Sequence, residues 1–325
     1  MFTKSTVFIL GAGSNVDYGF FTGTGLKNYC ANEFQKNYPK YLLESGAYNG
    51  DALKAATRDA KDLRKVISAD LHENIDHLLA MHPKQEDVGK MAIVDAILHG
   101  ERRSKELPLP KHDLYQSIFG LMVSGVLRPS DLSRVVENRA TFISFNYDRS
   151  LEYFLYNQLR RLADWDRSPV PFGDVYRKLA SVHHVYGSLG PFLGEDGVVP
   201  YGATPTIQTL IDCGGEIDVI YGGKKPRCNT MIAEALGTAE AVFYLGFGYD
   251  ENNMKILGLP TAVGKGTAVL GTGVNVHDDV RERATSSLKG HLKPTVLNHI
   301  TDLDCVKFVD DIVAPYSQGK AFRLR

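Results

Sequence analysis

Short apolar runs that end at small or polar residues recur along this 325-residue chain. Four of them have the length and composition of strands buried in a parallel sheet: Thr6–Leu10, Ala140–Phe145, Ala241–Leu245 and Thr267–Leu270. A weaker candidate covers Val182–Tyr186. Because helix-like sequence separates these runs, we expect an α/β fold with a Rossmann-like parallel sheet flanked by helices. Ligands of such sheets bind beyond the carboxyl ends of the strands, where Gly, Asn, Asp and Ser collect in this chain.

A long and mainly helical stretch separates the first two predicted strands. Asp51–His77 is rich in Ala, Leu, Lys, Asp and Glu and contains neither Pro nor Gly. We therefore expect a large helical insertion after the first strand, over residues 27–135, within a single domain of residues 1–325. It would serve as a lid or as an oligomer face. Residues 190–235 are rich in Gly and Pro at their start, and we expect an irregular segment there, near the site.

Composition and charge exclude several classes of function. Lys and Arg total 37 against 38 for Asp and Glu, so no basic excess indicates a nucleic-acid partner. The four cysteines are scattered and form no CxxC pair, which argues against a zinc site and against a disulfide framework. The N-terminus enters the first strand directly, and no segment is apolar for long enough to span a bilayer. We expect a cytoplasmic protein that needs neither metal nor membrane.

The stretch Val7–Gly23, VFILGAGSNVDYGFFTG, is the most informative part of the chain. Gly11, Ala12 and Gly13 follow the first strand, and small residues there leave room for a diphosphate near a helix start. The third glycine of G-x-G-x-x-G falls on Val16 instead. No acidic residue closes a second strand about 20 residues later, so a hydride-transfer fold is disfavoured.

Polar residues at the next two strand ends are candidates for catalysis. Asn146 and Asp148 lie two apart, so both would point to one side, where they could hold a carboxamide or orient a water. Either one could instead cap the following helix. His184 and Tyr186 would alternate onto one face, about 7 Å apart. Histidine is the usual general base near neutral pH, although a buried and fully hydrogen-bonded histidine is a common alternative.

Glycines after the fourth strand suit a close approach of backbone to a ligand. Gly246 and Gly248 stand in LGFGYD, and the same residues also suit a plain strand-to-helix turn.

Four segments in this order resemble the sirtuin-like domains of bacterial anti-phage defence, which are relatives of sirtuins without the zinc module. They are GAGSNVDYGFFTGTGL, SFNYD, YGSLG and LGFGYDENNMKIL, and the resemblance covers most of the chain, from residue 5 to residue 275. Asn74-Ile75-Asp76 resembles a short Ile-Asp signature in the helical insert of these proteins. The resemblance implies that NAD binds across the strand ends as a substrate. Water would then cleave the nicotinamide–ribose bond to give ADP-ribose and nicotinamide, and NAD depletion would stop the infected cell.

The resemblance also implies the roles of individual residues. Asn146 would position the water or the ribose hydroxyls, and Asp148 would engage the nicotinamide amide. The catalytic candidates are Asn146, His184 and Tyr186. The candidates for binding NAD are Gly11, Ala12, Gly13, Ser14, Asn15, Gly23, Asp148, Gly187, Ser188, Gly246 and Gly248.

One position departs from the relatives. They carry His immediately before the Gly-Ser turn, whereas this chain has Tyr186, and tyrosine with its pKa of about 10 is a poor base at neutral pH. His184 could serve instead. Two readings stay open, an active NAD hydrolase and a catalytically weak sensor or scaffold that binds NAD or ADP-ribose. A deacylase is disfavoured because no cysteine cluster accompanies the motifs. A silent effector needs control, so we expect a homo-oligomer and, by analogy, a partner such as an ATPase or another defence subunit.

Overall fold

A parallel sheet forms the centre of the protein. The computed structural model describes residues 1–70, 74–108, 111–126, 129–162, 165, 168, 170–192, 199–220, 224–258, 262–264, 266–274, 276–289 and 298–320. The described strands are β1 (Thr6–Leu10), β2 (Ala140–Ser144), β3 (Val182–His184), β4 (Ala241–Leu245), β5 (Ala268–Thr272) and β6 (Asn298–Thr301). They form one sheet in the order β3-β2-β1-β4-β5-β6, and every neighbouring pair is parallel. The expected α/β, Rossmann-like fold is therefore confirmed.

Strand order locates the natural ligand crevice. The order reverses between β1 and β4, because the chain builds outward from β1 to β3 on one side and from β4 to β6 on the other. In doubly wound sheets the turns on the two sides of this switch point diverge and leave a crevice beyond the carboxyl ends of the strands. The turns after β1, β2 and β4 lie next to this crevice.

Aromatic side chains fill one face of the sheet. Phe8 of β1 pairs in register with Phe142 of β2 and with Phe243 of β4. Their ring centroids lie 5.3 Å and 5.7 Å from that of Phe8. Phe308 and Tyr316 from the C-terminal helices contact Phe243 and cover this face. The three central strands are buried almost completely, which explains their continuous apolar sequence.

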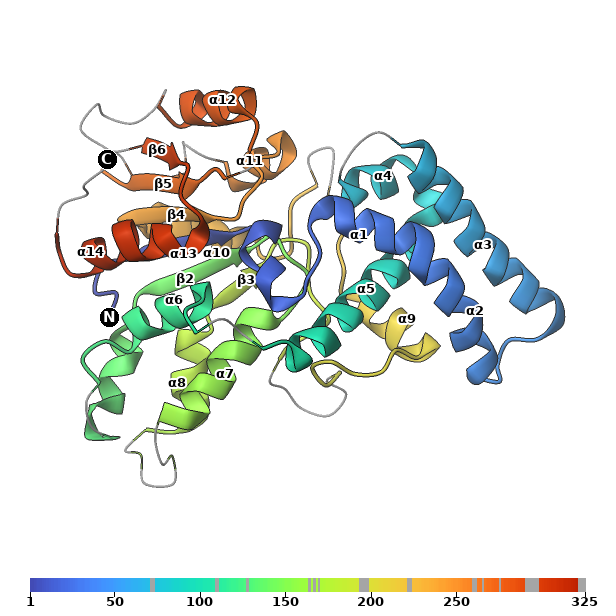
Figure 1. Cartoon of the computed structure of the whole chain (residues 1–325), viewed down its shortest axis with the longest axis horizontal. Coiled ribbons are helices and arrows are strands. Elements are labelled where there is room, and N and C mark those ends of the chain that lie inside the picture. The colour runs from blue at the N-terminus through green and yellow to red at the C-terminus, as the bar shows by residue number, and fades with distance from the viewer. Residues whose placement is uncertain are drawn as a thin grey trace.

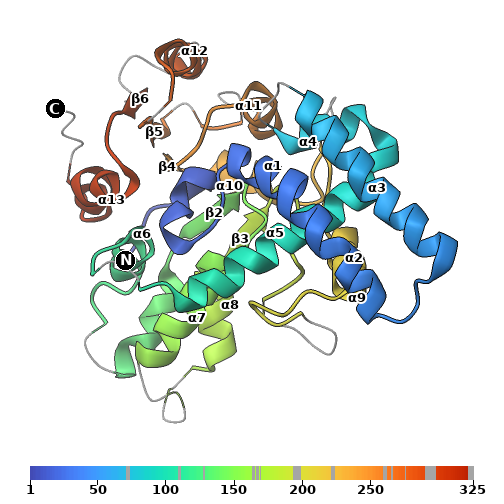
Figure 2. The same ribbon diagram turned by 45° about the vertical axis from the view of Figure 1, so that its right-hand side comes forward.

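Helices surround the sheet and also form a separate layer beyond the strand ends. In Figure 1, α1 to α5 and α9 lie together to the right of the sheet, and Figure 2 shows α5 passing close to it. The helices before β2 are α1 (Gly23–Tyr29), a π-helical turn (Cys30–Phe34), α2 (Gln35–Glu44), α3 (Gly50–Ala69), α4 (Ile75–Met81), α5 (Glu86–Glu106) and α6 (Leu114–Met122). The later helices are α7 (Ser150–Leu162), α8 (Phe172–Leu179), α9 (Ile207–Gly215), α10 (Asn229–Thr238), α11 (Glu251–Leu257), α12 (Asp278–Lys289), α13 (Cys305–Phe308), a π-helical turn (Val309–Val313) and α14 (Ala314–Ser317). Short 3-10 turns cover Ala12–Ser14, Val16–Tyr18, Pro83–Gln85 and Pro129–Glu137.

Two details differ from the sequence expectations. The stretch expected as one helical run over Asp51–His77 is divided, because α3 ends at Ala69 and α4 begins at Ile75. Asn74 caps α4, its side chain accepting a hydrogen bond of 2.8 Å from the Asp76 N–H. Residues 190–235 are not wholly irregular, since they contain α9 and the first part of α10. Residues 71–73, 193–198 and 221–223 of these segments lie outside the described part of the chain.

A buried ion pair connects the helical layer to the sheet. Arg149, directly after the β2 turn, donates two hydrogen bonds of 2.9 Å to the carboxylate of Glu101 on α5. Both side chains are almost completely inaccessible to solvent. The same carboxylate accepts a hydrogen bond from the Gly202 N–H, and Arg149 donates to the Val199 carbonyl. This bidentate contact holds α5 and the segment before α9 against the strand ends.

Candidate functional site

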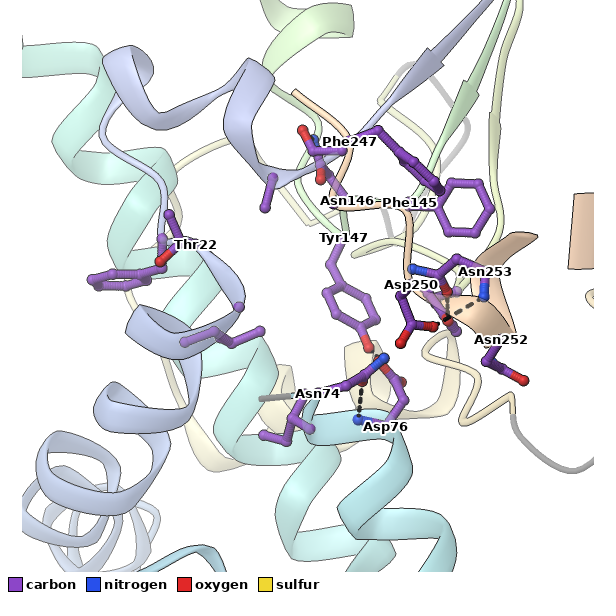
Figure 3. Close-up of a pocket in the computed structure, with 18 of the residues that line it drawn as sticks. Thr22, Asn74, Asp76, Phe145, Asn146, Tyr147, Phe247, Asp250, Asn252 and Asn253 are labelled. Carbon is purple, nitrogen blue, oxygen red and sulfur yellow. Dashed lines mark hydrogen bonds between the residues drawn. The ribbon is translucent and has the colours of Figure 1, made fainter. Parts of the chain in front are cut away.

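A large cavity lies at the switch point of the sheet. Its volume is about 740 Å³, a size suited to a cofactor or a dinucleotide fragment. The turns after β1, β2, β3 and β4 form one side, and the N-terminal residues of α1, α4 and α11 form the other. Figure 3 shows this arrangement, with Tyr147 extending from the β2 turn across the cavity toward α4. The site is therefore built jointly by strand ends and by the helical layer.

The glycines of the first and fourth strand ends pack against each other. Gly13 N–H donates to the Gly246 carbonyl at 2.9 Å, and Gly11 N–H donates to the Leu245 carbonyl at 3.0 Å. A Cβ on Gly246 would lie 2.1 Å from the Ser14 nitrogen, and a Cβ on Gly11 would lie 2.5 Å from the Gly246 oxygen. These glycines are required by the contact between the two turns. Gly248, in contrast, lines the cavity and has open space around its Cβ position.

Asn15 and Asp148 join the turns after β1 and β2 inside the cavity. The Asn15 amide donates a hydrogen bond to Oδ2 of Asp148, and the Ser150 N–H donates to Oδ1 at 3.0 Å. Both side chains are buried. Burial raises the pKa of Asp148 to about 6, an effect that the hydrogen bonds from Ser150 partly oppose. Asp148 thus contacts the start of α7, as the capping alternative expected, and lines the cavity as well.

The side-chain oxygen of Asn15, Oδ1, has no hydrogen-bond donor among the described residues. It is buried, and Asn15 itself is only 2% exposed. An unpaired buried acceptor is costly, which makes this atom a candidate contact for a ligand N–H.

Asn146 lines the same cavity with its side chain held from behind. Its amide donates to the Gly11 carbonyl at 3.1 Å and to Ser14 Oγ at 3.5 Å. Within the described residues no donor contacts its Oδ1. Ser14 also donates to the Gly11 carbonyl and does not reach the cavity. Asn146 is therefore fixed in place with an acceptor left for a ligand or a water.

Tyr147 and Asp76 form a buried pair that the sequence motifs did not assign to the site. The Tyr147 hydroxyl donates to Oδ1 of Asp76 at 2.6 Å. Burial raises the pKa of Asp76 to about 7, the Tyr147 hydrogen bond opposes this shift, and the charge of Asp250 adds to it. Burial also raises the pKa of Tyr147, so this residue is a neutral donor. In the sequence, only the resemblance of Asn74-Ile75-Asp76 to an Ile-Asp signature pointed to Asp76.

Tyr186 reaches the opposite wall of the cavity. Its hydroxyl donates to the Asn253 side chain on α11, and its ring lies 5.9 Å from that of Tyr147. Burial, with nearby Asp76 and Asp250, raises the pKa of Tyr186. A hydroxyl that holds its proton this tightly cannot act as a base near neutral pH. Tyr186 lines the cavity as a neutral hydrogen-bond donor.

His184 lies away from the cavity and is occupied by two acceptors. Its Nδ1 donates to the Asn146 carbonyl at 2.8 Å, and its Nε2 donates to Glu152 at 2.7 Å. Because both partners accept, the ring carries a proton on each nitrogen. Burial lowers the pKa of His184, but Glu152 and the Asn146 carbonyl more than offset this, so the pKa is raised overall. The expectation that His184 serves as the base does not agree with this geometry.

The physical reason is that β3 ends at His184. The alternation expected to bring His184 and Tyr186 onto one face stops there, and the chain turns at Val185 and Tyr186. Gly187 has φ +75° and pairs with Ile217, where a Cβ would lie 2.0 Å from the Glu216 oxygen. Packing therefore requires a glycine at position 187. Neither Gly187 nor Ser188 lines the cavity.

The predicted site residues consequently separate into two sets. Those that line the cavity are Gly11, Ala12, Asn15, Gly23, Asn146, Asp148, Tyr186 and Gly248. Those that do not are Gly13, Ser14, His184, Gly187, Ser188 and Gly246. Further polar lining residues that the sequence reasoning missed are Asn74, Asp76, His77, Tyr147, Asp250, Glu251, Asn252, Asn253 and Lys255.

The cavity wall is acidic. Asp76, Asp148, Asp250 and Glu251 all line it. Lys255 is the one lysine or arginine among the described lining residues, and it pairs with Glu251 at 2.6 Å. This balance favours a ligand that carries positive charge beside its polar groups.

The described residues were also compared with the requirements of a metal site and of a membrane helix. In the part of the chain that the structure describes, no group of His, Cys, Asp and Glu side chains is arranged to hold a metal ion. The described helices include none that is both long and apolar enough to cross a membrane. A scan against known protein families and a search of curated proteins both find no match.

Proposed function

We propose that this chain is an NAD⁺ hydrolase that cleaves the nicotinamide–ribose bond and releases ADP-ribose and nicotinamide. The observation that carries the proposal is the hydrogen bond between Asn15 and Asp148. It brings together two of the motifs that resemble sirtuin-like defence domains, at the switch point of the sheet. The same contact leaves the buried Asn15 oxygen without a donor among the described residues.

The chemistry of nicotinamide matches these groups. A primary carboxamide offers two N–H donors, and the Asn15 oxygen and the Asp148 carboxylate are acceptors for them. The nicotinamide ring of NAD⁺ is cationic although its diphosphate makes the whole molecule a net anion, so the acidic part of the wall suits the ring and not the diphosphate. Once the bond to ribose breaks, nicotinamide leaves as a neutral molecule, so no acid has to protonate it. Asn146, with its free acceptor, would orient the attacking water or a ribose hydroxyl.

A second candidate function is binding of NAD⁺ or ADP-ribose without cleavage. Two observations favour it: Tyr186 stands where relatives carry histidine, and His184 has both ring nitrogens hydrogen-bonded and lies outside the cavity lining. A sensor or scaffold of this kind would use the same cavity and the same acceptors.

Incubation of the purified protein with NAD⁺, with nicotinamide followed by chromatography, separates the two. We expect release by the wild type and loss of release in Asn146→Ala. Asn157→Ala is the matched control, because Asn157 lies on α7 and donates only to the Tyr153 carbonyl. Binding measured by calorimetry without any release would favour the sensor. A protein that neither binds NAD⁺ nor releases nicotinamide would refute both functions.

The cellular role that the resemblance suggests is anti-phage defence by NAD⁺ depletion, with activity controlled by oligomerisation or by a partner subunit. Cellular NAD⁺ should then fall after infection of bacteria that express the wild-type chain. It should stay constant in cells that express Asn146→Ala. Equal NAD⁺ levels in the two strains would refute the defence role and leave the enzymatic test unaffected.

A further inference from the structure

The turn after β2 brings the carboxyl group of Asp148 to the cavity, but its two oxygens already accept from Asn15 and Ser150. Tyr186 is a neutral donor, and His184 is occupied outside the cavity. A general base has to reach the water that attacks the ribose. The helical layer supplies a carboxyl group at this place. We infer that Asp76 is the general base of the proposed hydrolysis and that Tyr147 is the residue that positions it. This inference rests on the proposed function.

Asp76 is a buried carboxylate, 4% exposed, that is held in place at the cavity wall. Tyr147 donates to one of its oxygens, Oδ1, at 2.6 Å, and the N-cap Asn74 fixes the backbone beneath it. No described side chain donates to the second oxygen of Asp76, Oδ2, and Asp76 lines the cavity. Figure 3 shows Asp76 approaching the Tyr147 hydroxyl from α4, with Asp250 nearby on the other wall.

Tyr147 connects Asp76 to the residues proposed to bind nicotinamide. It stands between Asn146 and Asp148 in one turn, so the same turn carries the water-orienting amide, the carboxamide acceptor and the donor to Asp76. The carboxyl of Asp76 is therefore only one tyrosine side chain away from that turn. A ligand held by Asn15 and Asp148 would lie within the same cavity.

The charged and titratable neighbours of Asp76 favour a base that works near neutral pH. Burial and, to a smaller extent, the charge of Asp250 raise the pKa of Asp76, the Tyr147 hydroxyl opposes this, and the net pKa is about 7. Tyr186 faces it as a neutral hydroxyl, and His77 follows it on α4 and lines the cavity. A carboxylate with this pKa accepts a proton more readily than an ordinary aspartate.

The proposed step balances in atoms and charge. The oxygen of the water forms a bond to C1′ as the C1′–N bond breaks, and the electron pair of that bond leaves with nicotinamide. One proton of the water passes to the Asp76 carboxylate and from there to solvent. The products are ADP-ribose, neutral nicotinamide and one proton.

The test is the pH profiles of kcat and of kcat/KM for nicotinamide release, measured together with NAD⁺ binding by calorimetry. The wild-type kcat/KM, which reports the free protein, should fall as the pH drops below about 7, because the base must be ionised. Asp76→Asn keeps an acceptor for Tyr147, and we expect a kcat at least about 100-fold lower, with the acidic limb absent and NAD⁺ binding retained. Asp174→Asn is the matched control, since Asp174 is exposed on α8 and pairs with Arg177.

Tyr147→Phe tests the positioning role and also covers the case in which Asp76→Asn fails to fold. Removing the Tyr147 donor should raise the pKa of Asp76 and move the acidic limb up by about half to one pH unit. An unmoved limb in Tyr147→Phe would overturn the inference. The inference would also be overturned if Asp76→Asn kept the acidic limb and His77→Gln lost it. A wild type that binds NAD⁺ but releases no nicotinamide between about pH 5 and pH 9 would instead refute the hydrolase proposal itself.

Discussion

The contact between the turns after β1 and β4 should fail when Gly246 is replaced by alanine. Gly246 has φ +58°, in the left-handed region that residues with a side chain disfavour. An added Cβ would lie 2.1 Å from the Ser14 nitrogen and 2.3 Å from the Gly13 carbonyl carbon. Both are backbone atoms, so no side-chain rotation can relieve the clash. The two turns would have to separate, and Asn15 follows directly after one of them.

The size of the effect follows from two costs. The left-handed conformation costs a residue with a side chain about 1–2 kcal/mol, and inserting a methyl group into a packed region costs about 1–3 kcal/mol. The free energy of unfolding should therefore fall by roughly 2–5 kcal/mol. An unfolding entropy of about 2.1 cal/mol/K per residue gives roughly 1.5 °C per kcal/mol for a chain of 325 residues. We expect Tm to fall by roughly 3–7 °C.

Thermal melting of Gly246→Ala beside Gly248→Ala provides the assay. Gly248 stands two residues later in the same turn, lines the cavity and has nothing within 4 Å of its Cβ position. Its substitution should leave Tm nearly unchanged while weakening NAD⁺ binding, because the new methyl group would point into open space beside the ligand. Equal losses of Tm in the two variants, or no loss in Gly246→Ala, would refute the division between packing glycines and ligand-facing glycines.

Three further predictions follow from buried polar groups. Asn15→Ala should raise the Kd for NAD⁺ by about tenfold or more in calorimetry, since it removes a donor to Asp148 and an acceptor for the ligand, whereas exposed Asn28→Ala should not. Asp76→Asn should stabilise the protein more at pH 8 than at pH 5 when Tm is measured. The reason is that the pKa of Asp76 is about 7 in the folded state against 3.8 for a free side chain. The free energy of unfolding of the wild type therefore declines by up to roughly 4 kcal/mol as the pH rises from 3.8 to about 7, and the variant escapes this loss. An equal gain at both pH values would contradict this. Glu101→Gln should lower the free energy of unfolding in urea by roughly 3–5 kcal/mol because it leaves the Arg149 guanidinium buried without its ion pair, whereas Asp174→Asn at an exposed ion pair should change little.

The sheet was largely predictable because its strands are buried on both faces. β1 and β4 have the predicted bounds, and β2 differs by one residue, since their apolar runs are continuous. β6 was missed because Asn298–Thr301 is short and mixes polar with apolar residues. α9 was missed because glycine and proline near it indicated a loop, although Thr206 caps the helix by accepting from the Thr209 N–H.

Side-chain direction at the strand ends was less predictable. Asn146 and Asp148 both line the cavity, but Phe145 and Tyr147 line it too, because β2 ends at Ser144 and the strand alternation stops before these residues. The period-two rule also fails for His184 and Tyr186, because β3 ends between them and the backbone turns. Glycine pattern alone also could not separate Gly246, which a neighbouring turn requires, from Gly248, which faces open space.

The residues proposed to bind NAD⁺ and the residue proposed to react come from different layers of the protein. Asn15, Asn146 and Asp148 follow strands, where short motifs next to apolar runs reveal them in the sequence. Asp76 begins a helix that lies far from any strand in the sequence, and only the packing of α4 against the β2 turn brings it to Tyr147. On this proposal, the strand-end motifs suggest the ligand, whereas the reactivity of the cavity depends on how the helical layer is packed. For that reason, the substitution of histidine by Tyr186 at a strand end does not by itself decide whether the cavity can cleave NAD⁺.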